Sequence, residues 1–468
     1  MRKKIILSMV VSVSLFTGCG SDGDTDKNNQ EIKNNSNHQE SNKSRNNQNR
    51  HGQNRNSQNH NQTTTAYFGD KENNLIQVVD IDNMKLIDSI ATGHEKSYAA
   101  EVIKTMASHN SSTPKMYIDN RGSNAIDVLD SKTNSITKTI ELKFYPRSMD
   151  VQKETGLVAV SSTNKPMTSI IDSKTDTVIA TVGEDIVTYP TTSGHSYISS
   201  GTLACGHPHW IDREHFVLID RQNRKIVTYK IENIAGEWVT RKINEITTPS
   251  PVHNLIPPEV HGRHGRHHGA NTSTIFYATA EGATGVYPSV LELEFIQGEG
   301  LRVVENLEIK KEGLSPDVMG VHHLNFLKDQ KTIYVGSDEG NLFIVDYSVT
   351  PMRVIKTVKA GLGAGHTDEM KHGGDIAIVI NHKDSFITVM NSLTNEKIAD
   401  IEVSNLPKDE LGEVQTQSHP KYHFSKDGRY FYLFLTEEGA LVKVDLEQKK
   451  VVERLEIGGK LAMGAFIH

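Results

Sequence analysis

Residues 115–140 read KMYIDNRGSNAIDVLDSKTNSITKTI, and this stretch decides the fold. It contains a short apolar run, a polar turn, a second run that ends at Asp130, another turn, and a third run rich in Ile and Thr. Runs of four to six residues, rich in β-branched residues and bounded by Asp, Asn, Gly and Lys, are typical of β-strands in an antiparallel sheet. The stretch therefore predicts three consecutive antiparallel strands.

The same unit recurs along the chain. Further copies of its second strand lie at 75–80, 168–172, 342–346, 386–391 and 441–445. We count eight sets of three strands, which begin near residues 66, 115, 157, 216, 274, 332, 375 and 429. A several-stranded repeat of about 50 residues is the signature of propeller blades. The sequence predicts an all-β protein with a single eight-bladed propeller; a seven-bladed ring is the alternative if the irregular regions 183–215 and 246–273 mislead the count.

The two ends of the repeat region predict how the ring closes. The first set lacks an inner strand before it, and residues 460–468 form an inner strand with no set after it. Pairing these two segments completes one blade from both ends and removes the free sheet edges. We expect the propeller to span residues 65–468.

The N-terminus has the pattern of an export signal. Arg2, Lys3 and Lys4 precede an apolar stretch at 5–16, which is too short to span a bilayer and fits a signal peptide. The following Leu15-Phe16-Thr17-Gly18-Cys19 resembles the lipobox of bacterial lipoproteins. The resemblance implies that residues 1–18 are removed and that Cys19 is diacylated. We expect residues 19–64, which are almost wholly polar, to be a disordered tether.

Composition argues against nucleic-acid binding, a further membrane-spanning segment and an intramolecular disulfide. The formal net charge of −7 comes without a basic stripe, so nothing predicts nucleic-acid binding. No second apolar stretch reaches membrane-spanning length, and we expect a soluble domain on the outer side of a bacterial membrane, held there by lipid on Cys19. Because Cys205 is the one other cysteine, no intramolecular disulfide is expected once Cys19 carries lipid.

The histidines are the most informative residues. The chain has 22, and several recur at the start of each predicted inner strand, at intervals of about 40 to 60 residues that match the blade period. Equivalent positions in successive blades converge on one axis, and neutral imidazole is a good ligand for Cu and Zn. The sequence predicts a transition-metal site, with Cu favoured over Zn, formed by His207, His209, His267, His268, His322, His323, His366 and His419. Histidines bonded to water in a polar channel, or a haem or anion site, are the alternatives.

Other side chains near these histidines are secondary candidates. Cys205 alternates with His207 and His209, so on an extended segment all three would face one ion. Asp212, Asp368 and Glu369 follow predicted channel histidines, where a carboxylate can bind metal or orient an imidazole. Arg147 takes the corresponding place in a blade without histidine, where it would hold an anionic substrate or form a salt bridge.

Three resemblances bear on function. The repeat, as in Lys426-Asp427-Gly428-Arg429-Tyr430-Phe431-Tyr432, resembles the YVTN-type repeat of surface and periplasmic propellers. The histidine layout, with 322–323, 363–367 and 417–420, resembles the propeller of nitrous oxide reductase and of thiocyanate dehydrogenases, which implies a copper site. No cupredoxin domain follows the repeats, so nitrous oxide reduction is not implied. The His-rich stretch within 251–269 is similar to the loop of periplasmic propeller zinc metallochaperones.

Three functions therefore stay open at this point. One is a copper-dependent oxidoreductase that acts on a small molecule or anion. Another is a metal chaperone that delivers zinc to a membrane transporter. The third is a scaffold or adhesin without catalytic activity, because a propeller fold alone does not define function.

Overall fold

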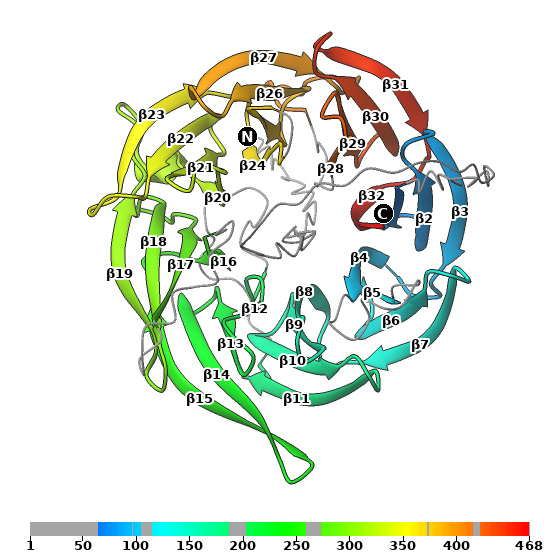
Figure 1. Cartoon of the computed structure of the whole chain (residues 1–468), viewed down its shortest axis with the longest axis vertical. Helices are drawn as coiled ribbons and strands as arrows, with labels where there is room; N and C mark the ends of the chain where they lie inside the picture. Colours follow the sequence, from blue (N-terminus) through cyan, green and yellow to red (C-terminus); the bar gives the residue numbers. More distant parts are fainter. Residues whose placement is uncertain are drawn as a thin grey trace, which may run out of the picture.

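The computed structural model describes residues 64–95, 97–103, 115–186, 203–258, 273–371, 374–414 and 422–467. The described residues form eight four-stranded antiparallel sheets, arranged as blades around a central axis (Figure 1). This confirms the predicted all-β fold and the count of eight blades over seven. The one helical segment in these ranges is a 3₁₀ turn, η3 (Pro316–Val318).

In seven of the blades, the strand that comes first in the chain lies innermost. Blade 2 consists of β4 (Ser97–Ile103), β5 (Lys115–Asn120), β6 (Ala125–Asp130) and β7 (Ser135–Glu141). Blade 3 consists of β8 (Pro146–Gln152), β9 (Leu157–Ser162), β10 (Met167–Asp172) and β11 (Thr177–Gly183). Blade 4 consists of β12 (His209–Trp210), β13 (His215–Asp220), β14 (Lys225–Ile234) and β15 (Glu237–Thr247).

The next four blades repeat the same order. Blade 5 consists of β16 (Val252–Ile256), β17 (Ser273–Ala280), β18 (Ser289–Ile296) and β19 (Gly300–Glu308). Blade 6 consists of β20 (Val321–Phe326), β21 (Thr332–Ser337), β22 (Asn341–Asp346) and β23 (Arg353–Lys359). Blade 7 consists of β24 (Ala364–Glu369), β25 (Ile376–Asn381), β26 (Phe386–Asn391) and β27 (Glu396–Glu402). Blade 8 consists of β28 (Tyr422–Phe424), β29 (Tyr430–Leu435), β30 (Ala440–Asp445) and β31 (Lys450–Glu456).

Blade 1 is built from both ends of the propeller, as the sequence predicts. Its outer strands are β1 (Thr65–Asp70), β2 (Leu75–Asp80) and β3 (Lys85–Ala91), and its inner strand is β32 (Leu461–Ile467). β1 and β32 pair in antiparallel fashion, with Thr65 opposite Ile467 and Tyr67 opposite Ala465. The pairing gives the inner edge of β1 a partner and closes the ring.

Tyrosines near the middle of the second strands link neighbouring blades. Their hydroxyls donate to the side chain of a turn residue in the next blade, at 3.0 Å from Tyr67 to Asn134 Oδ1 and 2.7 Å from Tyr334 to Asn395 Oδ1. Asn134 and Asn395 have φ of 49° and 57°, a left-handed conformation that Asn adopts more readily than most residues. Each of these Asn residues thus forms the turn of its own hairpin and also a hydrogen bond to the neighbouring blade.

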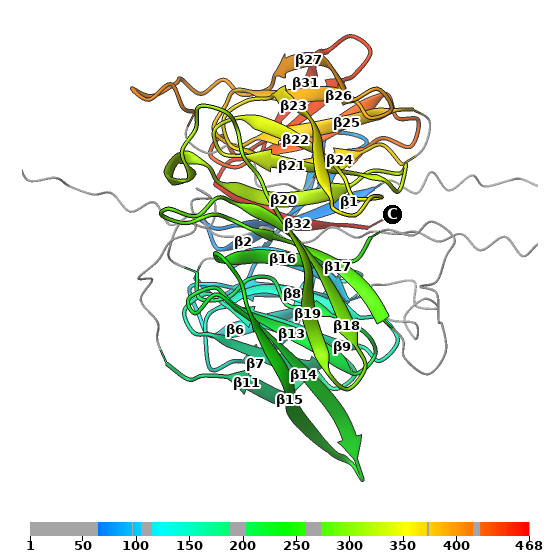
Figure 2. The same ribbon diagram turned by 90° about the vertical axis from the view of Figure 1, so that its left-hand side faces the viewer.

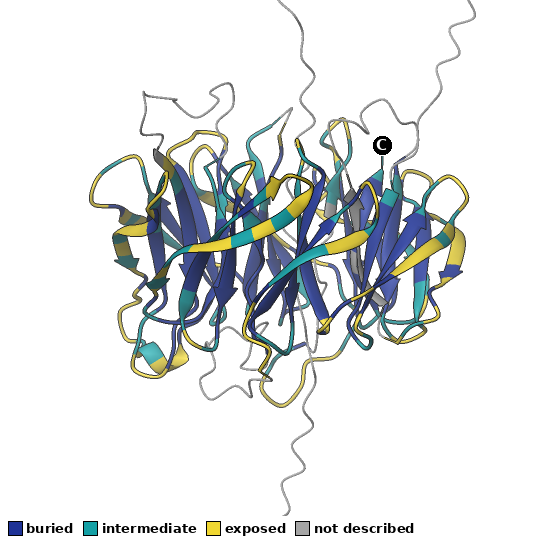
Figure 3. Cartoon of the chain, turned by 90° about the horizontal axis from the view of Figure 1, so that it is seen from below, coloured by how far each residue is buried: buried dark blue, intermediate teal, exposed yellow. Residues whose placement is uncertain are grey.

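The hydrophobic core lies between adjacent blades. One cluster, for example, joins Ile378 and Ile380 of β25 to Phe431 and Leu433 of β29. The second and third strands of each blade are mostly buried on both faces. In the outermost strands, exposed residues alternate with more buried ones, as the dark blue and yellow ribbons of Figure 3 show. Each sheet therefore packs against both of its neighbours, which keeps the inner strands fixed around the axis.

One hairpin departs from the regular blade. β14 and β15 are longer than the other strands of blade 4 and extend beyond the rim (Figure 2). Among the described residues, no helix has the length and apolar character needed to cross a membrane. The predicted signal peptide, Cys19 and most of the tether fall at 1–63, outside the described ranges.

Candidate metal centre

The inner strands of blades 4 to 7 bring five histidines together. His207 lies two residues before the start of β12, His253 lies on β16, His322 and His323 lie on β20, and His366 lies on β24. All five are buried, with exposed fractions between 0 % and 9 %. Four of these, all but His253, are among the residues that the blade period predicts.

The five imidazole rings form a continuous cluster. The Nε2 atoms of His207 and His253 are 3.1 Å apart. Ring centroids are 3.9 Å apart for His253 and His322, 4.5 Å for His322 and His323, and 4.3 Å for His323 and His366. Side chains from four blades therefore share one volume around the axis of the ring.

Three overlapping groups in this cluster have the geometry of a metal site. In each, one potential ligand atom per residue lies within 4.8 Å of the others. The groups are His207 with His253 and His323, His322 with His323 and His366, and His253 with Glu281 and His322. Because His253, His322 and His323 each belong to two groups, the arrangement offers alternative positions for an ion.

Three of the histidines have their Nδ1 atoms held by a side chain outside the five. Glu281 Oε1 lies 3.1 Å from Nδ1 of His253, and the Asn254 amide lies 2.9 Å from Nδ1 of His323. Nδ1 of His366 and Nε2 of His382 share a hydrogen bond of 2.7 Å. Such contacts fix the ring orientation of metal-binding histidines and leave Nε2 for the ion.

Positive charge lies next to the cluster. The guanidinium of Arg147, which is fully buried on β8, reaches to 3.5 Å from Nδ1 of His253. Arg221 donates to the carboxylate of Glu281, which also faces His253. Glu281 therefore lies between a buried cation and an imidazole, and it balances the charge of Arg221.

Burial keeps the imidazoles of His207, His253 and His323 neutral. It is the main cause that lowers the pKa of His207 and of His253 well below the usual 6.5, helped by Arg147 and by neighbouring histidines. Burial, with Arg147 as a second cause, lowers the pKa of His323 to about 3. A neutral imidazole keeps a lone pair on one nitrogen, which is the form that binds metal.

The buried histidine groups could therefore hold a metal ion, and two atoms favour it. Nδ1 of His207 and Nε2 of His323 are buried and have no hydrogen-bond partner. A buried polar atom without a partner costs about 1–3 kcal/mol, which an ion at coordination distance would offset. The donor set of imidazole nitrogens suits Cu and Zn alike and does not distinguish them.

The structure does not bring Cys205 and His209 into the cluster with His207. Cys205 pairs with Asp220 of its own blade, whereas the backbone N–H of His207 donates to the carbonyl of His253 in blade 5 at 2.9 Å. Gly206 permits this close approach, since a Cβ there would lie 2.6 Å from the His253 carbonyl oxygen. His209 then pairs with Val217, so the three side chains do not share one face.

Each of the two residues has its own contacts. The Cys205 thiol, fully buried, donates to the backbone carbonyls of Lys165 at 3.2 Å and Met167 at 3.5 Å. Burial raises the pKa of this thiol to about 12, so it stays protonated. His209 lies 3.4 Å from Asp150 Oδ2. Neither residue belongs to the three groups of potential ligands found among the described residues.

The other predicted candidates lie apart or outside the described ranges. His267, His268 and His419 are outside them, and the inner strand of blade 5 is β16, which precedes the His-rich stretch. Asp212 accepts from His215 Nδ1 at 2.9 Å, and Glu369 accepts from the backbone N–H of Lys328 at 2.5 Å. Asp368 lies on β24, two residues after His366.

The blade period does not predict His253, Glu281 or His382, although a positional signal exists for Glu281 and His382. Glu281 directly follows β17 and His382 directly follows β25, the second strands of their blades. Arg121 and Arg221 take the same place after β5 and β13. In blades 4, 5 and 7, the charged or histidine side chain directly after the second strand therefore contacts the cluster or one of its partners.

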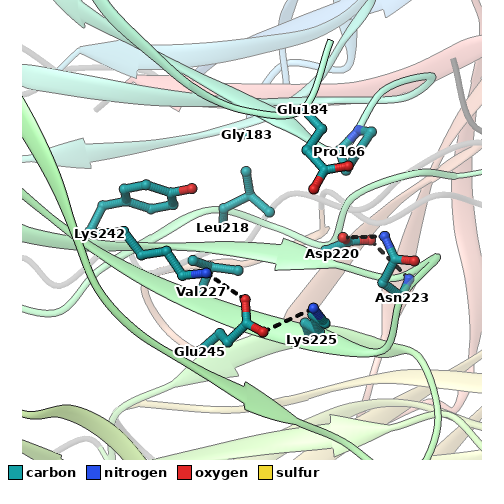
Figure 4. A pocket seen from close by; sticks show the side chains of 11 residues that line it. Pro166, Gly183, Glu184, Leu218, Asp220, Asn223, Lys225, Val227, Lys242 and Glu245 are labelled. Carbon is teal, nitrogen blue, oxygen red and sulfur yellow. Dashed lines mark hydrogen bonds and ion pairs between the residues drawn. The ribbon is translucent and has the colours of Figure 1, made fainter. Parts of the chain in front are cut away.

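One shallow pocket lies away from the cluster, between blades 3 and 4 (Figure 4). Its charged side chains pair with one another: Glu245 accepts from Lys225 at 2.9 Å and from Lys242 at 2.6 Å. Asp220 accepts from Asn223 at 2.7 Å. Because these groups already satisfy each other, the pocket does not compete with the cluster as a functional site.

Comparison with known proteins supports the fold. The sequence matches no family model and no curated protein. Among solved structures, the chain is similar to dihydro-heme d1 dehydrogenase NirN in complex with DHE, with a TM-score of 0.59, 13% identity, and coverage of 86% of this chain and 74% of NirN. It is also similar to AztD of Citrobacter koseri, with a TM-score of 0.54, 9% identity, and coverage of 87% and 98%. The apo form of that AztD gives a TM-score of 0.52 at 8% identity, with coverage of 86% and 98%. At these identities the likeness is one of architecture, and this chain is an eight-bladed β-propeller that shares its fold with NirN and AztD.

Proposed function

We propose that this protein binds copper through the histidine cluster at the axis of its propeller and uses it in the oxidation or reduction of a small molecule. The observation that carries the proposal is the convergence of His207, His253, His322, His323 and His366, whose potential ligand atoms fall into three groups, each within 4.8 Å. Five buried imidazoles from four blades are difficult to explain by packing alone.

Several features favour a resident ion over histidines bonded to water. All five rings are buried, burial keeps His207, His253 and His323 neutral, and Nε2 of His323 has no hydrogen-bond partner. Buried polar groups nearly always have a hydrogen-bond partner in folded proteins. An unpaired nitrogen of His323, next to four other imidazoles, therefore favours a bound ion. Glu281 and His382 supply the outer contacts that metal-binding histidines usually have.

We favour copper over zinc because of the order of metal affinities and the number of ligands in the cluster. The order of divalent-metal affinities places Cu²⁺ above Zn²⁺ for nitrogen ligands. Structural zinc sites in proteins are almost always four-coordinate, whereas the three groups together offer five imidazoles and one carboxylate, which is more than one such site uses. When bound, copper would supply one-electron chemistry, and the surrounding protein would hold the imidazoles in place and keep bulk water out.

Metal delivery is the second candidate. The His-rich sequence at 261–268 begins five residues after the end of β16, the strand that carries His253 of the cluster. A chaperone would take up zinc there and pass it inward, and a membrane transporter would be its partner. The likeness to AztD is compatible with this alternative at the level of fold. Deep burial of the cluster argues for a retained ion instead.

We also propose that the protein acts outside the cytoplasm, anchored by lipid. The proposal rests on the sequence Leu15-Phe16-Thr17-Gly18-Cys19 after an apolar stretch with Arg2, Lys3 and Lys4 before it. Two acyl chains on Cys19 would give stable membrane attachment, which one chain does not.

Metal analysis of the full chain, exported and purified without chelator, tests the function. We expect about one copper ion or more per chain, with visible absorption and an electron paramagnetic resonance signal that change on reduction. One colourless zinc ion that transfers to a competing chelator would favour delivery. Protein that holds neither metal, and takes up neither from solution, would overturn both proposals.

A further inference from the structure

We infer that Asn254 and Thr279 act as positioning residues that place the proton of His323 on Nδ1, so that Nε2 of His323 is its metal-binding nitrogen. The role of this arrangement rests on the proposed function, but the position of the proton does not. His323 matters most here because it belongs to two of the three groups of potential ligands.

A buried chain of hydrogen bonds runs across blades 5 and 6. The Thr279 hydroxyl donates to the backbone carbonyl of His322 at 2.7 Å. The same hydroxyl oxygen lies 3.3 Å from the Asn254 side-chain amide, and the other end of that amide lies 2.9 Å from Nδ1 of His323. Thr279 and Asn254 are 0 % and 2 % exposed, so water does not compete for these contacts.

The carbonyl of His322 decides the direction of every bond in this chain. A carbonyl oxygen only accepts, so the one hydroxyl proton of Thr279 is donated to the carbonyl of His322. The hydroxyl oxygen of Thr279 can then only accept a hydrogen bond from Asn254. With Oδ1 of Asn254 facing Thr279, two acceptors would meet with no second proton between them. A half turn of the amide removes the conflict, and the exchange of its nitrogen and oxygen leaves the shape unchanged.

The orientation of the amide then fixes the imidazole. With its nitrogen donating to Thr279, Asn254 presents its oxygen to Nδ1 of His323. That oxygen can only accept, so His323 carries its proton on Nδ1 and a lone pair on Nε2. Nε2 is the buried atom that has no hydrogen-bond partner. The opposite tautomer would bury an N–H donor there, which no metal ion could satisfy.

The neighbouring histidine follows the same rule with a different partner. His253 donates from Nδ1 to Glu281 Oε1 at 3.1 Å, and its Nε2 faces His207. The carboxylate of Glu281 and the amide of Asn254, both in blade 5, therefore orient the rings of His253 and His323 in the same way. The neutral amide at His323 also avoids a second negative charge next to Glu281.

Nitrogen-15 NMR of metal-free protein with labelled histidine tests the tautomer directly. Comparison with His323→Gln assigns the signals of His323. We expect a protonated Nδ1 and an unprotonated Nε2 at neutral pH. A protonated Nε2 in the wild-type protein would overturn the inference, whether or not the protein binds metal.

Substitutions then test the consequence for binding, with Cu²⁺ titrated against a chelator of known affinity. Asn254→Leu removes the acceptor, and we expect a 10- to 100-fold weaker affinity, the range seen when outer-shell partners are lost. Asn254→Asp keeps an acceptor toward Nδ1 and should bind at least ten times more tightly than the leucine variant. Thr279→Val should weaken binding, and Thr279→Ser should restore it.

A matched control separates this effect from general loss of packing. Thr228 is a fully buried threonine on β14 whose hydroxyl has no hydrogen-bond partner. Thr228→Val should leave both the affinity and the His323 tautomer unchanged. If Asn254→Leu and Asn254→Asp bind copper equally while both stay folded by thermal unfolding, the inference fails. Wild-type protein that binds no metal would refute the proposed function instead, and the NMR result would still decide the tautomer.

Discussion

Nε2 of His207 and Nε2 of His253 face each other at 3.1 Å, although the two residues belong to adjacent blades and are 46 positions apart in sequence. Two neutral imidazoles at this distance share one proton, so one of the two lone pairs is covered. A metal ion bound by both nitrogens would displace that proton. The contact between blades 4 and 5 is thus a place where metal and proton compete for the same two atoms.

Loss of His253 should remove metal, whereas loss of His209 should not. His253→Ala takes a nitrogen out of two of the three groups, and we expect a loss of at least tenfold in copper affinity. His209→Ala is the matched control, because His209 contacts Asp150 and belongs to none of the groups. Metal content measured on both purified variants checks the prediction. Equal metal content in the two would argue against the channel site.

Glu281→Gln should weaken metal binding and destabilise the fold together. The change removes the carboxylate that accepts from His253 and leaves the buried Arg221 without its counter-ion. Breaking a buried ion pair in this way costs about 3–5 kcal/mol, which denaturant unfolding would detect. The control is Glu245→Gln at the exposed pair with Lys242, where we expect a change of about 1 kcal/mol or less.

The stability of the metal-free protein should fall in acid because of the buried histidines. Burial holds the pKa of His323 at about 3 in the folded state, against 6.5 when exposed. As the pH falls from 6.5 toward 3, the unfolded chain binds a proton that the folded chain does not, so stability is lost over this window. His323→Gln removes that proton, and its unfolding free energy should fall less steeply, by about 1.4 kcal/mol per pH unit.

Denaturant unfolding of both proteins at several pH values between 4 and 7 measures the difference. Because other titrating groups are common to both proteins, subtracting the two curves isolates His323. Parallel curves would mean that His323 binds its proton equally in the folded and the unfolded chain, which would contradict the prediction.

Cys205 should be inert toward thiol reagents and unnecessary for metal. Its thiol is fully buried, and burial raises its pKa to about 12, so almost no thiolate exists at neutral pH. We expect an alkylating reagent to leave Cys205 unmodified in the folded protein and to label it after unfolding. Cys205→Ala should retain full metal content. Rapid labelling of the native protein, or loss of metal in the variant, would restore Cys205 as a candidate ligand.

Cys19→Ser should release the protein from the membrane. Without the thiol there is no site for the acyl chains, so the exported chain should appear in the soluble fraction. Fractionation and labelling with a radioactive fatty acid check this in the wild type and the variant. Cys205→Ser is the control and should remain in the membrane fraction. Membrane association of the Cys19 variant would point to a different anchor.

The blade architecture is predictable from the sequence because each blade carries its own signals. Runs such as Ala125–Asp130 have the β-branched content of a strand, and residues such as Asn134 and Asn395 tolerate the left-handed turn that joins two strands. The missing inner strand of the first repeat predicts the pairing of β1 with β32. These signals are local, and the ring follows from their repetition.

The metal cluster is predictable in part. His207, His322, His323 and His366 follow the period of the blades, so their convergence can be inferred. The place of His253 in the cluster cannot be inferred in this way, because residues 257–272 separate β16 from β17 and shift the spacing in blade 5. The position of His209 depends on Gly206, which lets the chain turn toward β16 after Cys205. A close backbone approach of this kind leaves no periodic signal.

The pairing of β1 with β32 has a consequence for the order of events in the cell. These strands lie at opposite ends of the propeller sequence, so the ring cannot close until every other blade has been made. Contacts between such distant segments form slowly, because the chain must first search for them. An exported chain would therefore reach its final compartment with the ring still open. Its histidines would be exposed to whichever metals that compartment supplies, so the timing of export, as much as the affinity of the site, would decide which ion is enclosed.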